Sequence, residues 1–435
     1  SSSIALALVL LLSIAYETPL NITISLSNNR RRLFSLGSIV AILIYCYASF
    51  PLSAAMAFDH RAKVAMANNN SAKAYNQLLI ASGLVPWDPT YHLRLGLGII
   101  NARESVKNLE QYQELTNSAI KYFKDALEAT PYHPHLNRNV GILEQKNNPR
   151  KAQKYFSNEL QLVHRLNNQY YAYYSWALNE LRKPSSNEKK VIQALSIQAL
   201  IEPKFLTFNL WKSELFNPFK EAVLKQTLAH FETLLAKTPK NSSGYKTLYN
   251  NYITIKWWHN MKLEEVNNTL LFPISQALLI AENQPEKAIK ILNSEINSRS
   301  SPVSALFLFR AWIKPDLYLD AYFEKISKIN KINENNISIK KEKLIKKINQ
   351  NSSLKKFIVS FEPVPLNQFY LKSWYYSYRN SDIRNLKVLN YPNLREYAFI
   401  RILKMFPDYP RSLPSLERYV EKIKADQLGL PHPTT

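Results

Sequence analysis

The sequence is poor in glycine and has a single cysteine. Only 7 of its 435 residues are glycine, which argues against folds with many tight β turns and against glycine-rich loops that cradle phosphates. The one cysteine, Cys46, cannot form a disulfide within the chain. We therefore expect neither a disulfide framework nor a β-rich fold.

Signatures of catalytic and metal sites are also missing. The sequence contains no cysteine pair, no Gly-x-Ser-x-Gly motif and no Walker loop. Its histidines are dispersed, and the closest two, His133 and His135, supply at most two ligands to a metal. The sequence therefore predicts no catalytic residue, no metal and no cofactor in this chain.

Positive charge is in excess, with a formal net charge of +23. The bias toward Lys, Asn and Ile is what a genome rich in A and T produces without selection for a partner. Lysines gather at 340–356, where they form a solvated helix face or, alternatively, contact anionic lipid or phosphorylated glycolipid. No nucleic-acid-binding motif accompanies the charge, so we expect no nucleic-acid partner.

Two stretches share one pattern of small residues, large residues and proline. At offsets 0, +4, +7 and +12 they carry Ala74, Leu78, Ala81 and Pro86, and then Ala119, Phe123, Ala126 and Pro131. Small residues let two helices approach closely, and proline ends one helix and begins the next. The pattern, with Leu95-Gly96 and Val140-Gly141 in the junctions, resembles the tetratricopeptide repeat. An ordinary helical bundle with chance spacing is the alternative.

The pattern predicts an all-α fold that changes character along the chain. Tetratricopeptide-like repeats are expected over 59–165, with helices at Pro89 to Arg103, Glu110 to Thr130, Pro134 to Lys146 and Pro149 to Val163. Degenerate helical repeats follow over 166–300, including a helix at Asn187 to Ile201. The last region, 301–435, is expected to be helical and of unknown type.

The N-terminal region is strongly apolar. Residues 33–57, from Leu33 to Ala57, carry no charge over 25 positions, and about 20 apolar residues suffice to span a bilayer as a helix. The run from Ile4 to Tyr16 is shorter, and because the first residue is Ser1 we interpret it as the end of a truncated span. We expect one or two transmembrane helices in 1–58; a buried helix of a soluble protein is the alternative.

Orientation follows from the charges that flank this span. Arg30, Arg31 and Arg32 precede it directly, which by the positive-inside rule favours a cytoplasmic N-terminal side. Arg61 and Lys63 follow it and favour the opposite orientation. We expect a bacterial inner membrane protein with residues 60–435 in the periplasm, and the reverse orientation stays open.

Apolar spans with a short Arg-rich loop, passing directly into tetratricopeptide-like units, resemble the C-terminal end of bacterial O-antigen ligase/polymerase-type membrane proteins. The resemblance is one of architecture and covers about residues 1–165. It implies an accessory part of an enzyme that assembles surface polysaccharide. The family's catalytic residues lie upstream of this region, so the resemblance assigns none here. A membrane-anchored scaffold without enzymatic activity is the alternative.

Repeat solenoids bind through a concave surface formed by the first helix of each pair. Counting from the proline junctions predicts that five polar residues face this groove and contact a protein partner or a lipid-linked glycan: Asn101, His135, Arg138, Gln145 and Lys146. The aromatic cluster Tyr170, Tyr171, Tyr173, Tyr174 and Trp176 would also suit a sugar. Packing in the core is the interpretation we favour for it.

Overall fold

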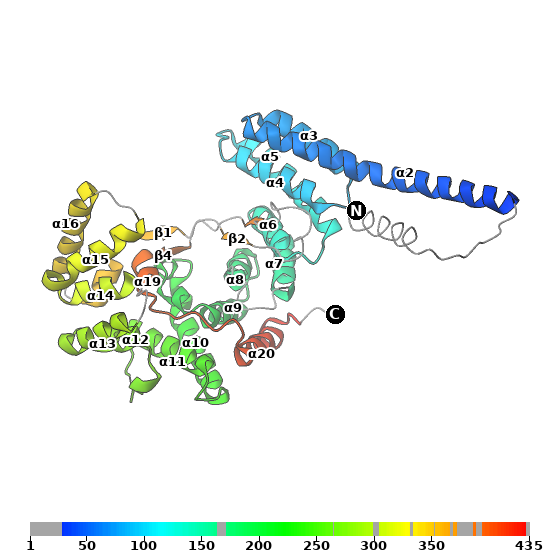
Figure 1. Ribbon diagram of the computed structural model, residues 1–435. Helices are drawn as coiled ribbons and strands as arrows, with labels where there is room; N and C mark the ends of the chain where they lie inside the picture. The colour runs from blue at the N-terminus through cyan, green and yellow to red at the C-terminus, as the bar shows by residue number, and fades with distance from the viewer. Residues whose placement is uncertain are drawn as a thin grey trace, which may run out of the picture. The chain divides into compact units, whose positions relative to one another are not determined.

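The computed structural model describes residues 28–162, 171–263, 265–298, 304–330, 334–351, 353–365, 369–371, 386–388 and 394–431. Within these residues the fold is all-α, and consecutive helices pack as pairs in the manner of helical repeats (Figure 1). This confirms the predicted fold class at that level. Two short antiparallel ribbons are added, β1 (Pro363–Pro365) with β4 (Arg395–Tyr397) and β2 (Phe369–Leu371) with β3 (Leu386–Val388). The chain forms two compact units, Ser1–Pro131 and Tyr132–Thr435.

In the described part of the first unit, residues 28–131, the helices form two pairs. Its helices are α2 (Asn28–Ala67), which packs on α3 (Ser71–Leu84), and α4 (Pro89–Arg103), which packs on α5 (Leu109–Ala129). Each of the three later helices begins at a short polar side chain that accepts a hydrogen bond from a backbone N–H of the first turn: Asn70, Asp88 and Asn108. Such caps satisfy N–H groups that a helix cannot satisfy itself.

Glycine and phenylalanine interlock within the second of these pairs. Gly96 of α4 lies so close to the ring of Phe123 in α5 that a Cβ at position 96 would be 2.4 Å from Phe123 Cε1. Phe123 is completely buried, as are the repeat positions Ala81, Ala119 and Ala126. The small residues of the repeat pattern therefore act as predicted and let large side chains fill the space between paired helices.

The second unit continues the same packing. Its first helices are α6 (Pro134–Glu144), α7 (Pro149–Leu162), α8 (Ala172–Arg182), α9 (Glu188–Ile201), α10 (Lys220–Lys237) and α11 (Ser243–Trp258). A Cβ at Gly141 of α6 would lie 2.9 Å from Phe156 Cε1 of α7, which repeats the contact between Gly96 and Phe123. The described residues thus show this glycine–phenylalanine contact in both units.

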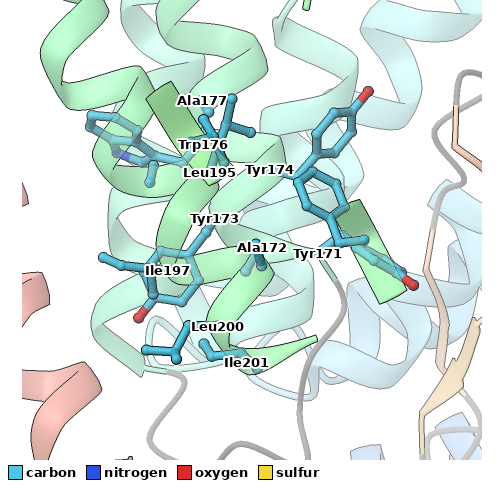
Figure 2. Packing of buried hydrophobic residues seen from close by; sticks show 14 of the residues in the cluster. Tyr171, Ala172, Tyr173, Tyr174, Trp176, Ala177, Leu195, Ile197, Leu200 and Ile201 are labelled. Atoms are coloured by element: carbon cyan, nitrogen blue, oxygen red, sulfur yellow. The ribbon is translucent and has the colours of Figure 1, made fainter. Parts of the chain in front are cut away.

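The aromatic cluster of α8 belongs to the core of the second unit. Tyr171, Tyr173, Tyr174 and Trp176 are each at most 6% exposed. Figure 2 shows them beside aliphatic side chains of α9 such as Leu195 and Ile197. Their burial confirms the core interpretation for these four residues; Tyr170 lies outside the described residues.

The remaining elements continue the helical chain and then bring its C-terminal part back to the start of the second unit. They are the short helices η2 (Pro203–Thr207), η3 (Asn209–Lys212), η4 (Asn217–Phe219) and η5 (Asn268–Leu270), the α-helices α12 (Pro273–Ile280), α13 (Pro285–Asn297), α14 (Ser304–Ile313), α15 (Pro315–Asn330), α16 (Glu334–Gln350), α17 (Leu354–Val359), α19 (Ala398–Leu403) and α20 (Pro414–Ile423), and a final π-helical turn, η7 (Lys424–Leu428).

Helix α20 packs against α10, and η7 packs against α9. The ammonium of Lys424 is completely buried there and donates a hydrogen bond to the backbone oxygen of Leu160, at 3.1 Å. The Tyr419 hydroxyl and His230 Nδ1 are hydrogen bonded at 2.9 Å. The C-terminal segment is therefore part of the core, which a linear solenoid alone would not give.

No helix among the described residues is both long and apolar enough to cross a membrane. The predicted run from Ile4 to Tyr16 lies outside those residues. The predicted span from Leu33 to Ala57 falls within α2, and most side chains of this span are also outside the described part of the structure. The membrane span stays a prediction.

Candidate functional site

The five residues predicted to line a groove differ in burial. Asn101 is exposed near the end of α4, in the first unit. In the second unit His135, Arg138 and Gln145 are at most 7% exposed, whereas Lys146 is exposed just after α6. The structure thus brings His135 and Arg138 together on the packed side of α6. Partner binding by these residues stays a prediction.

Arg138 ties α6 to two neighbouring helices. Its Nη1 lies 3.6 Å from Glu159 Oε1 of α7, and its Nη2 donates to the Ser175 hydroxyl of α8 at 3.3 Å. Glu159 is completely buried, and this burial raises its pKa to about 7, although the positive charge of Arg138 lowers it. The three residues form a buried polar contact among α6, α7 and α8.

The two histidines before and in α6 are neutral packing residues. Their rings meet edge to face with centroids 5.7 Å apart. Burial lowers the pKa of His133 to about 4 and that of His135 well below its ordinary value. His133 Nδ1 accepts from the backbone N–H of Leu136, so it caps the helix. In the described parts of the chain, no group of three His, Cys, Asp or Glu side chains is placed to hold a metal.

A cavity of about 600 Å³ opens elsewhere in the second unit. Its volume falls within the range typical of small-molecule sites, about 300–1,000 Å³. One side is the end of α9 with the start of η2, and the other is the C-terminal segment from β4 through α19 to residue 411. The lining residues are Ile201, Glu202, Pro203, Lys204, Glu396, Ile400, Arg401, Lys404, Phe406, Pro407, Asp408, Tyr409 and Arg411.

Two carboxylates and two cations form a connected network in this cavity. Glu396 is completely buried; its Oε2 accepts from Arg401 at 3.0 Å, and its Oε1 lies 3.7 Å from Lys204 Nζ. The same ammonium lies 2.8 Å from Glu202. Burial raises the pKa of Glu202, although the positive charge of Lys204 acts to lower it. Burial alone would lower the pKa of Lys204, but the two carboxylates raise it.

Left-handed backbone occurs at two points next to the network. Tyr171, whose phenol is hydrogen bonded to Glu202, has φ +55°, and Lys404 at the end of α19 has φ +48°. Left-handed backbone is uncommon for residues with side chains and costs about 1–3 kcal/mol, so surrounding contacts must hold it. At Lys404 this geometry follows directly on α19, whose Arg401 is held by Glu396.

The cavity was not found by sequence reasoning, because Glu202 and Glu396 of its charge network are 194 positions apart (396 − 202 = 194) and no motif links them. The only local signal was Pro203, just after the helix predicted at Asn187 to Ile201.

Comparison with the models of known protein families and with curated protein sequences finds no match for this chain. Its paired charges and its volume make the cavity a candidate ligand site.

Proposed function

We propose that this chain is a helical-repeat scaffold that binds a macromolecular partner along the surface of its helix pairs. The observation that carries this proposal is the glycine–phenylalanine contact found in both units, Gly96 with Phe123 and Gly141 with Phe156. Helical-repeat proteins stack such pairs into extended surfaces that bind other molecules.

Exposed apolar side chains on α3 support a binding surface in the first unit. Tyr75 and Leu79 are spaced one turn apart and remain 37% and 44% exposed. Ile80 beside them is 43% exposed. Neighbouring exposed apolar residues of this size are typical of interaction sites.

The finer proposal is that the scaffold is attached to a bacterial inner membrane through the charge-free segment Leu33 to Ala57, lies in the periplasm, and serves surface polysaccharide assembly as the accessory part of an O-antigen ligase/polymerase-type protein. Its support is the sequence, in which this charge-free segment forms part of α2, the first helix of the first helix pair. The alternative is a membrane-anchored scaffold that binds another protein and has no enzymatic partner.

A photo-crosslinking experiment in cells that naturally produce the protein tests the scaffold. A photoreactive amino acid replaces Leu79, and in a matched control it replaces Lys189, an exposed residue of α9. We expect a discrete adduct from position 79 and none from position 189. A carbohydrate component in the adduct would favour the polysaccharide role, and a purely protein adduct the alternative. Identical adduct patterns at both positions would refute the proposed surface.

Membrane attachment is tested separately by fractionation. We expect the full chain in the membrane fraction after an alkaline wash, and we expect deletion of 28–57 to release it. A full chain that stays in the soluble fraction would overturn the attachment and leave the scaffold proposal standing.

A further inference from the structure

We infer that the cavity between the end of α9 and the segment 396–411 binds a small organic oxyanion that also carries hydroxyl groups. A phosphate or carboxylate group would lie at its rim, and a hydroxyl would donate to Glu396 within it. This inference is independent of the scaffold proposal, because it rests on a different set of residues.

The rim supplies the positive charge. Arg401, Lys404 and Arg411 line the cavity, and all three are exposed. The side chain of Arg401 is 58% exposed, and its contact with Glu396 is made through Nη2, one of its two terminal nitrogens. A guanidinium has five N–H donors in a planar fork that matches phosphate and carboxylate. Lys404 forms no ion pair with the described residues, so its ammonium is available to an anion.

The interior supplies an acceptor. Glu396 Oε1 is buried and accepts no hydrogen bond from the described residues, although Glu396 lines the cavity. A buried acceptor without a hydrogen bond costs free energy that a donor from a ligand would recover.

The donor that fits is neutral. Glu202 and Glu396 are already balanced by Lys204 and Arg401. Asp408, Lys404 and Arg411 also line the cavity, so its lining carries three carboxylates and four cations. This excess of positive charge disfavours an added ammonium or divalent cation, whereas a neutral hydroxyl is not repelled. The side chains of Ile201, Pro203, Ile400 and Phe406 also line the cavity and would contact the carbon skeleton of the ligand.

Isothermal titration calorimetry of the full chain tests the inference with glycerol 3-phosphate as the probe. Glycerol, which supplies only the hydroxyl groups, and inorganic phosphate, which supplies only the phosphate group, serve as controls. Glucuronate is a second probe, in which a carboxylate replaces the phosphate. We expect saturable binding of at least one of the two hydroxylated oxyanions, tighter than that of glycerol or phosphate alone. Absence of saturable binding by both at low ionic strength would overturn the inference.

Variants assign the binding to this cavity. Lys404→Glu reverses an exposed charge at the rim, and loss of one charge-assisted hydrogen bond corresponds to about a tenfold weaker affinity. Lys189→Glu makes the same change at an exposed residue that does not line the cavity, and we expect no effect. If both variants weaken ligand binding equally, or if neither weakens it, the ligand binds elsewhere and the inference is refuted.

Glu396→Gln tests the donor separately, with the helical circular dichroism signal as the control for folding. It should weaken glycerol 3-phosphate binding more than inorganic phosphate binding, because only the former carries alcohol hydroxyls beside its phosphate group that can reach Glu396. Sedimentation with vesicles of phosphatidylglycerol or of phosphatidylcholine shows whether the oxyanion is a lipid headgroup. If the chain sediments with phosphatidylglycerol vesicles and Lys404→Glu abolishes this, the ligand is a lipid headgroup. If the chain binds only the soluble probe, the ligand is a free metabolite.

Discussion

The buried contact between Arg138 and Glu159 makes the stability of the second unit depend on pH in a defined direction. Burial raises the pKa of Glu159 from 4.5 to about 7 in the folded chain. The folded chain therefore binds more protons than the unfolded chain between these two values, and the stability present below pH 4.5 is lost as the pH rises through 7. One pKa unit corresponds to about 1.4 kcal/mol, so the loss is roughly 3 kcal/mol.

Glu159→Gln removes this titration and keeps the shape of the side chain. We would unfold the wild-type chain and the variant in urea at about pH 4 and about pH 8, with tryptophan fluorescence as the signal. The variant should gain roughly 3 kcal/mol relative to the wild type between the two pH values. His133 and His135 also titrate abnormally, but they are present in both proteins and cancel in the comparison.

The result that would refute this reasoning is specific. If the difference in unfolding free energy between the two proteins is the same at both pH values, Glu159 titrates in the folded chain as it does in the unfolded one. The side chain would then be hydrated in solution, and the packing of α6, α7 and α8 around it would be looser than described. A loss of unfolding free energy that the substitution causes equally at both pH values does not affect the test, because only the difference between the two pH values is compared.

Three substitutions test the helix pairs through thermal unfolding followed by circular dichroism. Gly141→Ala places a Cβ 2.9 Å from Phe156 and should cost about 1–3 kcal/mol through overpacking. Gly83→Ala in α3 meets no atom within 4 Å and should be neutral or stabilising by up to about 1 kcal/mol; destabilisation by this control would contradict the account of Gly141. Asp88→Ala removes the acceptor for the Thr90 N–H and should cost about 1 kcal/mol, whereas an unchanged unfolding temperature would show that the cap contributes little.

Helix boundaries could be predicted closely where local chemistry sets them. Pro89 and Arg103 bound α4 in the structure as in the prediction. The helix predicted at Asn187 to Ile201 begins at Glu188, because Asn187 is its N-cap and accepts from the Lys190 N–H. Proline and capping residues act on their own first turn, so a single sequence carries this information.

The burial of a helix face depends on neighbours that the sequence pattern does not identify. The spacing of α6 places His135 and Arg138 on one face of the helix, but it does not identify α8 as a neighbour of Arg138. The structure shows this neighbour in the contact between Arg138 and Ser175, 37 positions later. Periodicity predicts which residues share a face, whereas the packing partner of that face is a property of the whole fold.

The cavity could not be predicted from the sequence for the same reason. The contacts that form its wall also contribute to the stability of the fold. The segment 396–411 is held in place by the Tyr409 hydroxyl, which donates to the backbone oxygen of Leu200 at 2.7 Å, and by Glu396, which contacts Lys204. These contacts join parts of the chain about two hundred positions apart, where no sequence periodicity operates. Because they both anchor the C-terminal segment and form the cavity wall, substitutions of Lys204 or Glu396 alter folding and binding together. Lys404 belongs to the rim but not to the anchor, and it is therefore the residue at which ligand binding can be separated from stability.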